Sequence, residues 1–214
     1  EMIEKIQSHP NIDLRLNTEL EGVEGFVGNF KSRLLSEGRE EQVEHGVAVI
    51  ATGAFEARPH EYLYGEDERV VTHLELDQRF MRNDPALKEM KSAVFIQCVG
   101  SREPDRPYCS RVCCSHAMES ALHLKKLNPQ MRVVVLYRDI RTYGEREYLY
   151  RDARMAGVLF IPYTVDRKPR VVTHEGDLKI EVMDPLLGKD VAMTVDLLCL
   201  ASAIVPYRDE ALAR

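Results

Sequence analysis

Buried strands and helices alternate along the second half of the chain. Three continuous apolar runs predict strands, the first two of them buried. They span residues 92–100, 131–138 and 158–163. Between them, apolar residues recur at helical spacing and predict helices over 110–127 and 145–157, the second closed by Gly157. This order predicts a parallel βαβαβ unit, followed by hairpin-like strands and a final buried strand, Leu197–Leu200.

The first half of the chain is patterned differently. Apolar and polar residues alternate over 12–36 between glycine turn signals, which predicts a β-meander. The apolar run 47–50 predicts a strand buried on both faces that ends at Thr52–Gly53. Further on, Thr72 is the expected N-cap of a short helix, and 83–92 reads as a linker.

The change of periodicity near residue 91 predicts a domain boundary, with domains over 1–91 and 92–214. The chain begins at Glu1 inside a helical pattern and ends over 207–214 in what resembles a helix start. We therefore expect it to be an excised piece of a longer polypeptide.

Composition excludes several classes of protein. Apolar residues make up 44% of the 214 residues, enough for a core, and the net charge of −6 makes nucleic acid an unexpected partner. No apolar run approaches the ~18 residues that span a bilayer, so we expect no transmembrane segment. The acidic start does not resemble a signal peptide, and we expect a reducing cytoplasm. Clustered cysteines there are metal ligands or redox groups more often than disulfides.

The turn after the first buried strand lacks a dinucleotide fingerprint. A βαβ unit that binds a dinucleotide carries G-x-G-x-x-G at this turn, where the pyrophosphate approaches the backbone and the helix N-terminus. Here the turn reads C-V-G-S-R, and only Gly100 remains. We therefore expect the crevice above the sheet not to bind NAD(P).

Cysteines have taken the place of those glycines. Cys98, Cys109, Cys113 and Cys114 have the spacing C-x10-C-x3-C-C. Strand-end and helix-start positions meet at the carboxyl edge of a parallel sheet, so we expect the four thiols to converge. The helix N-terminus is expected to lower thiol pKa values. The spacing favours an iron–sulfur cluster over tetrahedral zinc, a redox disulfide or inert thiols, and Cys199 reads as a small core residue.

Two motifs carry a family resemblance over essentially the whole chain. The segments FIQCVGSREPDRPYCSRVCC and LYRDIRTYGEREYLYRDARMAGVLFI closely resemble the A-subunit of heterodisulfide reductase and its relatives in quinone-interacting membrane-bound oxidoreductase complexes. The resemblance implies a thioredoxin-reductase-like flavoprotein core, with a Rossmann-like NAD(P)-type domain over 92–214 and part of an FAD-type domain over 1–91. It also implies that Cys98, Cys109, Cys113 and Cys114 ligate a [4Fe-4S] cluster.

The resemblance extends to cofactors and partners. Ala51, Thr52 and Gly53 match the A-T-G that ends a buried strand beside FAD in this superfamily. The family's FAD glycine fingerprint is absent, and we expect the isolated chain to be inactive. The whole oxidoreductase is expected to pass electrons between FAD, its clusters and partner subunits in anaerobic energy metabolism.

A few other residues near the cysteines could have functional roles, and the sequence leaves two alternative functions open. Arg138 follows the second strand, where an arginine meets the NADP 2′-phosphate in true reductases. Arg102, Arg106 and Arg111 flank the cysteines, and His116 is expected to face solvent rather than bind metal. The alternative functions are an NAD(P)H-dependent disulfide oxidoreductase with a cysteine pair from the motif, and a structural zinc or docking domain.

Overall fold

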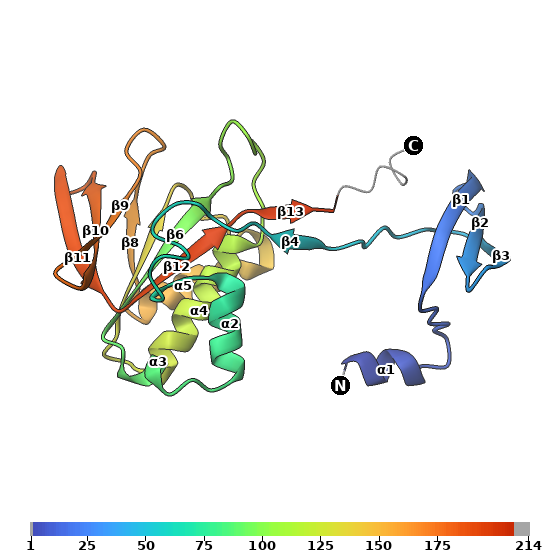
Figure 1. Ribbon diagram of the computed structural model, residues 1–214, viewed down its shortest axis with the longest axis horizontal. Coiled ribbons are helices and arrows are strands. Elements are labelled where there is room, and N and C mark those ends of the chain that lie inside the picture. Colours follow the sequence, from blue (N-terminus) through green and yellow to red (C-terminus); the bar gives the residue numbers. More distant parts are fainter. Residues whose placement is uncertain (1, 208–214) are drawn as a thin grey trace. The chain divides into compact units, whose positions relative to one another are not determined.

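A computed structural model describes residues 2–207 of the chain (Figure 1). It divides into two compact units, Glu1–Thr52 and Gly53–Arg214. The helix start predicted over 207–214 lies, apart from its first residue, outside the described residues. Within the described part of the chain, no helix has the length and apolar character that crossing a membrane requires.

The smaller unit is a short helix followed by an antiparallel meander. Its elements are α1 (Met2–Ser8), β1 (Thr18–Phe26), β2 (Asn29–Ser36) and β3 (Arg39–His45), and the strands stand in the order β1-β2-β3. The turn from β2 to β3 is made by Glu37 and Gly38, both with positive φ, which is the geometry that matches the twist of a tight hairpin. The predicted meander is therefore confirmed.

The buried strand predicted at 47–50 is wrong. These residues form no strand, and Val47, Val49 and Ile50 are exposed by 70%, 85% and 82%. A strand is buried on both faces only when other strands flank it in a sheet, and none of the sheets in the described residues includes this segment. The apolar side chains of this run therefore stay exposed, because no strand among the described residues pairs with the segment.

The larger unit is built on a five-stranded parallel sheet. Its strands stand in the order β5 (Val70–Thr72), β12 (Leu197–Ser202), β6 (Ser92–Val99), β7 (Arg132–Tyr137) and β8 (Leu159–Pro162). Every neighbouring pair is parallel. The predicted parallel βαβαβ unit and the α/β, Rossmann-like fold class are therefore confirmed.

Helices cover one face of this sheet and a small antiparallel sheet covers the other (Figure 1). The helices are α2 (His73–Met81), α4 (Cys113–Leu127) and α5 (Glu147–Met155), and the small sheet holds β9 (Arg170–His174), β10 (Asp177–Asp184) and β11 (Lys189–Val195). Along β6, Ala93 and Phe95 pack with the helices, whereas Val94 and Ile96 pack with β10. These two apolar cores explain why the strand shows no polar alternation.

Strand β5 and helix α2 belong to this larger unit, although we predicted a domain boundary after residue 91. Strand β5 pairs in parallel with β12, and Leu76 of α2 is fully buried in the helix-side core. The compact units consequently divide between Thr52 and Gly53, because a ladder to a strand far along the chain holds β5 in the sheet. The assignment of 1–91 to an FAD-type domain stays a prediction.

Local signals set the ends of several elements. Thr72 and Glu75 form a reciprocal capping box at the start of α2, as the N-cap prediction required. Gly157 ends α5 with a φ of +81°, a conformation that glycine adopts without strain. The predicted linker 83–92 instead holds a short helix, α3 (Ala86–Glu89), because Leu87 is buried in the core. The unit also contains a short antiparallel pair of strands, β4 (Ala54–Glu56) and β13 (Ile204–Pro206). A 3-10 turn, η1 (Gly144–Arg146), comes directly before α5.

Candidate metal centre

The four cysteines of the 98–114 segment line one pocket at the carboxyl edge of the parallel sheet. The other lining residues are Gln97, Ser101, Arg102, Ser110, Arg111, Asp139 and Arg141. The side chains pack closely around this pocket, which is partly open to solvent. The structure therefore brings the predicted residues together, while their role as ligands stays a prediction.

A sharp turn at the end of β6 delivers the first thiol. Cys98 has a φ of +62° and Gly100 a φ of +66°, and the backbone N–H of Ser101 donates to the Cys98 carbonyl at 3.2 Å. A positive φ is uncommon for a cysteine and costs free energy, so the surrounding structure must hold it in place. Strained residues of this kind concentrate at functional sites.

The adjacent cysteines at the start of α4 reach toward different neighbours. The Cys113 Sγ lies 4.0 Å from the carbonyl oxygen of Ser202, which ends β12. The Cys114 Sγ lies 3.7 Å from the carbonyl oxygen of Asp139, which follows β7. Because β12 and β7 flank β6 on its two sides, the two thiols approach the pocket from opposite sides of the β6 end.

The loop that carries Cys109 is tied to its surroundings. The backbone N–H of Arg102 donates to the Tyr108 carbonyl at 3.1 Å, and that of Arg111 donates to the Cys109 Sγ at 3.4 Å. The Arg138 guanidinium donates to the carbonyls of Ser101 and Arg102 at 3.4 and 3.1 Å. Arg138, which directly follows β7, therefore supports the cysteine loop.

Positive charge surrounds the pocket. Three guanidinium groups line it, those of Arg102, Arg111 and Arg141, with one carboxylate, that of Asp139. Asp139 binds Arg102 at 2.6 Å and Arg141 at 3.4 Å, while the Arg111 Nε donates to the Tyr143 hydroxyl at 3.1 Å. The lining groups sum to two positive charges, which suits an anionic occupant.

Burial raises the pKa values of three of the thiols. It raises the pKa of Cys113 to about 12, and raises those of Cys98 and Cys114 as well. Neighbouring thiols add to the increase, and the Arg102 guanidinium partly opposes it at Cys98. The expected lowering of thiol pKa by the helix N-terminus is wrong for these three groups, because desolvation outweighs it.

The residues present fit a thiolate-bound iron–sulfur cluster. Four thiols line one pocket, cationic side chains surround it, and the amide of Gln97, which also lines it, has no hydrogen-bond partner among the described residues. Within residues 2–207, no three His, Cys, Asp or Glu side chains are arranged to hold a single metal ion. The thiols thus line a common space without meeting at one point.

Other predicted residues have identifiable places. Ala51, Thr52 and Gly53 are exposed and belong to no strand. Cys199 is fully buried in the helix-side core, as predicted, with its Sγ 3.6 Å from His73 Nδ1.

Two further side chains near the cysteines have partners in the protein. The Arg106 guanidinium donates to the Gly100 carbonyl at 3.5 Å. His116 is half-buried rather than solvent-facing, because it pairs with Asp77 at 2.9 Å and stacks on His73 with ring centroids 4.3 Å apart.

Two residues of the site were missed from the sequence. The Ser110 hydroxyl accepts from the Ile204 backbone N–H at 2.9 Å, which links the cysteine loop to β13. Gln97 interrupts the apolar run of β6 and was passed over as part of that strand. A polar residue within an otherwise apolar strand, directly before a motif cysteine, was the available signal.

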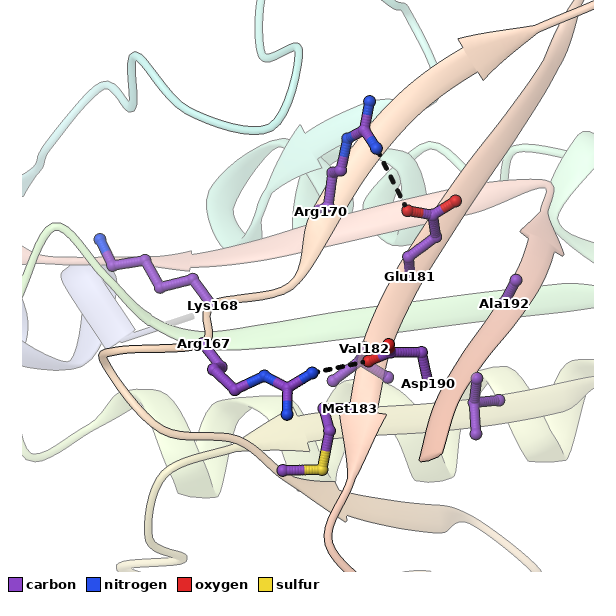
Figure 2. A pocket seen from close by; sticks show the side chains of 9 residues that line it. Arg167, Lys168, Arg170, Glu181, Val182, Met183, Asp190 and Ala192 are labelled. Atoms are coloured by element: carbon purple, nitrogen blue, oxygen red, sulfur yellow. Dashed lines mark hydrogen bonds and ion pairs between the residues drawn. The ribbon is translucent and has the colours of Figure 1, made fainter. Parts of the chain in front are cut away.

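A second, wider groove lies on the small antiparallel sheet, away from the cysteines (Figure 2). Its cations face carboxylates: Arg167 pairs with Asp190 at 3.1 Å, and Arg170 with Glu181 at 3.6 Å. Lys168 turns away from the groove and reaches Glu103 at 2.7 Å. The groove therefore presents paired surface charges rather than a cluster of reactive groups.

The fold and the cysteine pocket together define a class: a Rossmann-like α/β domain with four cysteines around the turn that carries glycines in dinucleotide-binding domains. Comparison with curated proteins then gives the particular relationship. The chain is 34% identical over 191 residues to the second form of the iron–sulfur A-subunit of CoB–CoM heterodisulfide reductase from Methanopyrus kandleri. It is 35% identical over 188 residues to the A-subunit of the H2:CoB–CoM heterodisulfide,ferredoxin reductase from Methanothermobacter marburgensis.

These matches cover 80% and 79% of the chain. The chain thus belongs to the family of heterodisulfide reductase A-subunits, and the predicted resemblance is confirmed. It spans about 28% of the length of these curated relatives. No protein-family model matches it.

Solved structures of enzymes also align with the chain. L-lysine 6-monooxygenase from Pseudomonas syringae aligns with a TM-score of 0.49 at 13% identity, over 95% of this chain and 56% of its own. An NAD-dependent persulfide reductase from A. fulgidus aligns with a TM-score of 0.45 at 21% identity, over 98% of this chain and 35% of its own.

Proposed function

We propose that the chain is the electron-transfer portion of a flavin and iron–sulfur oxidoreductase, in which Cys98, Cys109, Cys113 and Cys114 ligate a [4Fe-4S] cluster. The observation that carries the proposal is the shared pocket of these four thiols at the carboxyl edge of the sheet. Thiolates are the protein ligands of such clusters, and four are needed. A bound cluster supplies one-electron transfer.

Each group in the pocket has a definable task in this proposal. The strained turn at Cys98 orients one thiol, and the start of α4 presents the adjacent pair toward two sides of the pocket. Arg102 and Arg141, held by Asp139, place positive charge beside an anionic centre. Because the pKa values of these thiols are raised, the thiols are protonated before the cluster binds, and cluster binding releases their protons.

The flavin is a separate part of the proposal. Ala51, Thr52 and Gly53 are the residues of this chain that would approach FAD, and the φ of +75° at Gly53 suits a close backbone approach. These residues are exposed and do not enclose a flavin by themselves, so we assign no step to it. The expectation of FAD comes from the family resemblance alone.

The relatives' names suggest the wider setting. They are subunits of CoB–CoM heterodisulfide reductases, some of them also named for H2 or ferredoxin. We propose that the whole protein likewise exchanges electrons with partner subunits of such a complex, in the cytoplasm and in anaerobic energy metabolism. The five described cysteines are all free thiols, which agrees with a reducing compartment.

Anaerobic reconstitution tests the cysteine site. The chain should bind about four irons and about four sulfides and give the visible absorption and reduced-state EPR signal of a [4Fe-4S] cluster. Changing Cys98, Cys109, Cys113 or Cys114 to Ser should lower the iron content, because each change removes a thiolate ligand.

Cys199→Ser is the matched control, since this thiol is fully buried in the core and does not line the pocket. It should leave the iron content unchanged. Stoichiometric zinc in protein purified anaerobically, with no iron uptake, would instead support the structural zinc alternative. A reversible disulfide without bound metal would support the disulfide oxidoreductase.

A further inference from the structure

Gln97 carries a fully buried side-chain amide with no partner in the protein. Its exposed fraction is 0%, and among residues 2–207 neither its Nε2 nor its Oε1 finds a hydrogen-bond partner. Buried amides are nearly always hydrogen-bonded, because one left unpaired loses the bonds it made to water. Each such orphan in a folded protein requires an explanation, and an occupant that the protein itself does not supply is one.

Packing of the strand around Gln97 does not require an amide. The other residues of β6 between Ala93 and Val99 are apolar or cysteine, and all are buried. A methionine or leucine would fill the same space without an orphaned amide. The backbone of Gln97 does have a partner, because its carbonyl accepts from the Tyr163 hydroxyl at 2.5 Å. The side chain alone is left without one.

The position of Gln97 on β6 places its side chain beside the cysteine pocket. Side chains alternate along a strand, and Ala93 and Phe95 pack with the helices. Gln97 is the next residue on that face, at the end where α4 begins, and it lines the same pocket as the four cysteines. An occupant held by these thiols would therefore face the Gln97 amide, and in an iron–sulfur cluster the acceptors it presents are sulfur atoms.

We propose that Gln97 donates an N–H from its amide to a sulfur of the bound cluster and thereby raises the cluster's reduction potential. The inference rests on the proposed iron–sulfur site. One-electron reduction adds a negative charge to the cluster, and a fixed donor stabilises the more negative state most. Gln97 thus acts directly on the cluster's reduction potential and does not contact substrate.

The test compares midpoint potentials of wild type and Gln97→Met, which keeps the length of the side chain and removes its donor. Both are reconstituted anaerobically, iron is measured, and each is titrated with dithionite while the reduced cluster is followed by EPR. We expect equal iron content and a reduction equilibrium about tenfold less favourable in Gln97→Met, a shift of about 59 mV to more negative potential for a one-electron couple. Ile96→Val is the control, because Ile96 packs on the opposite face of β6. Its potential should match wild type.

The outcomes separate the two proposals. Wild type that takes up no iron overturns the cluster site, and this inference with it. Wild type and Gln97→Met with equal iron and equal potentials overturn the role of Gln97 alone.

If Gln97→Met does not take up iron, pulsed EPR of reduced wild type made with glutamine labelled at the amide nitrogen decides. Of the lining residues, Gln97 is the glutamine, so a magnetic coupling to the label supports the hydrogen bond. Its absence overturns it.

Discussion

Removing the buried imidazole of His73 should make the larger unit less sensitive to acid. His73 is 4% exposed, and its Nε2 has no hydrogen-bond partner among the described residues. Its ring stacks on those of Phe95 and His116, with centroids 5.9 and 4.3 Å away. Burial, with a smaller contribution from His116, lowers the pKa of His73 from 6.5 to about 3.

The sign and size of the effect follow from proton linkage. Above pH 6.5 the imidazole is neutral in both the folded and unfolded states, and it contributes no pH dependence. Below pH 6.5 the unfolded chain binds a proton that the folded chain refuses, so the free energy of unfolding falls with pH until the folded pKa is reached near pH 3. Between pH 6.5 and 4.5 the loss from this one group is about 2 kcal/mol.

Urea unfolding followed by tyrosine fluorescence measures this loss in the larger unit, because all nine tyrosines lie beyond residue 53 and the chain has no tryptophan. His73→Phe keeps an aromatic ring in the stack and removes the titration. Its stability should fall by about 2 kcal/mol less than that of wild type between pH 6.5 and 4.5. His123→Asn, which removes an exposed histidine of α4, should parallel wild type. Equal pH slopes for wild type and His73→Phe would refute the reasoning.

Two further predictions concern a helix cap and a nucleotide. Thr72→Ala should destabilise the larger unit by about 1 kcal/mol in the same urea assay at neutral pH, because it removes the hydroxyl that accepts from the Glu75 backbone N–H; Thr72→Ser should keep most of the stability, and an alanine variant as stable as wild type would contradict the capping role. Calorimetry should detect no saturable NADH binding at micromolar concentration, because the turn after β6 keeps only Gly100 of the glycine fingerprint; a saturable heat would show that the cysteine turn admits a dinucleotide.

The sequence by itself determined the elements whose signals are local. Continuous apolar runs marked β6, β7, β8 and β12. In β6, β7 and β12 the reason is a core on each face, which needs apolar side chains at nearly every position. Strand β8 lies at the edge of the sheet and is only partly buried. The capping box marked the start of α2, and Gly157 marked the end of α5, since these residues satisfy backbone groups within a few positions of themselves. Strand–helix alternation then left a parallel sheet as the expected arrangement.

The cysteine motif lies between the local and the tertiary levels. Its spacing, at a strand end and a helix start, was enough to predict that the four cysteines line one pocket, because the carboxyl ends of parallel strands meet at one edge of the sheet. The directions of the adjacent thiols Cys113 and Cys114 depend on which strands flank β6. That order is set by pairing across the whole unit.

Only the tertiary structure decided what depends on distant neighbours. The apolar residues of 47–50 are exposed because no described strand pairs with them. Strand β5 is buried because β12 pairs with it in the parallel sheet. The pKa values of Cys98, Cys113 and Cys114 rise because packing removes water from these thiols. This burial depends on many segments that are distant in the sequence. The Gln97 amide lacks a partner for the same reason. The sequence shows that residue 97 is a glutamine, but only the fold determines which groups lie within hydrogen-bond distance of its side chain.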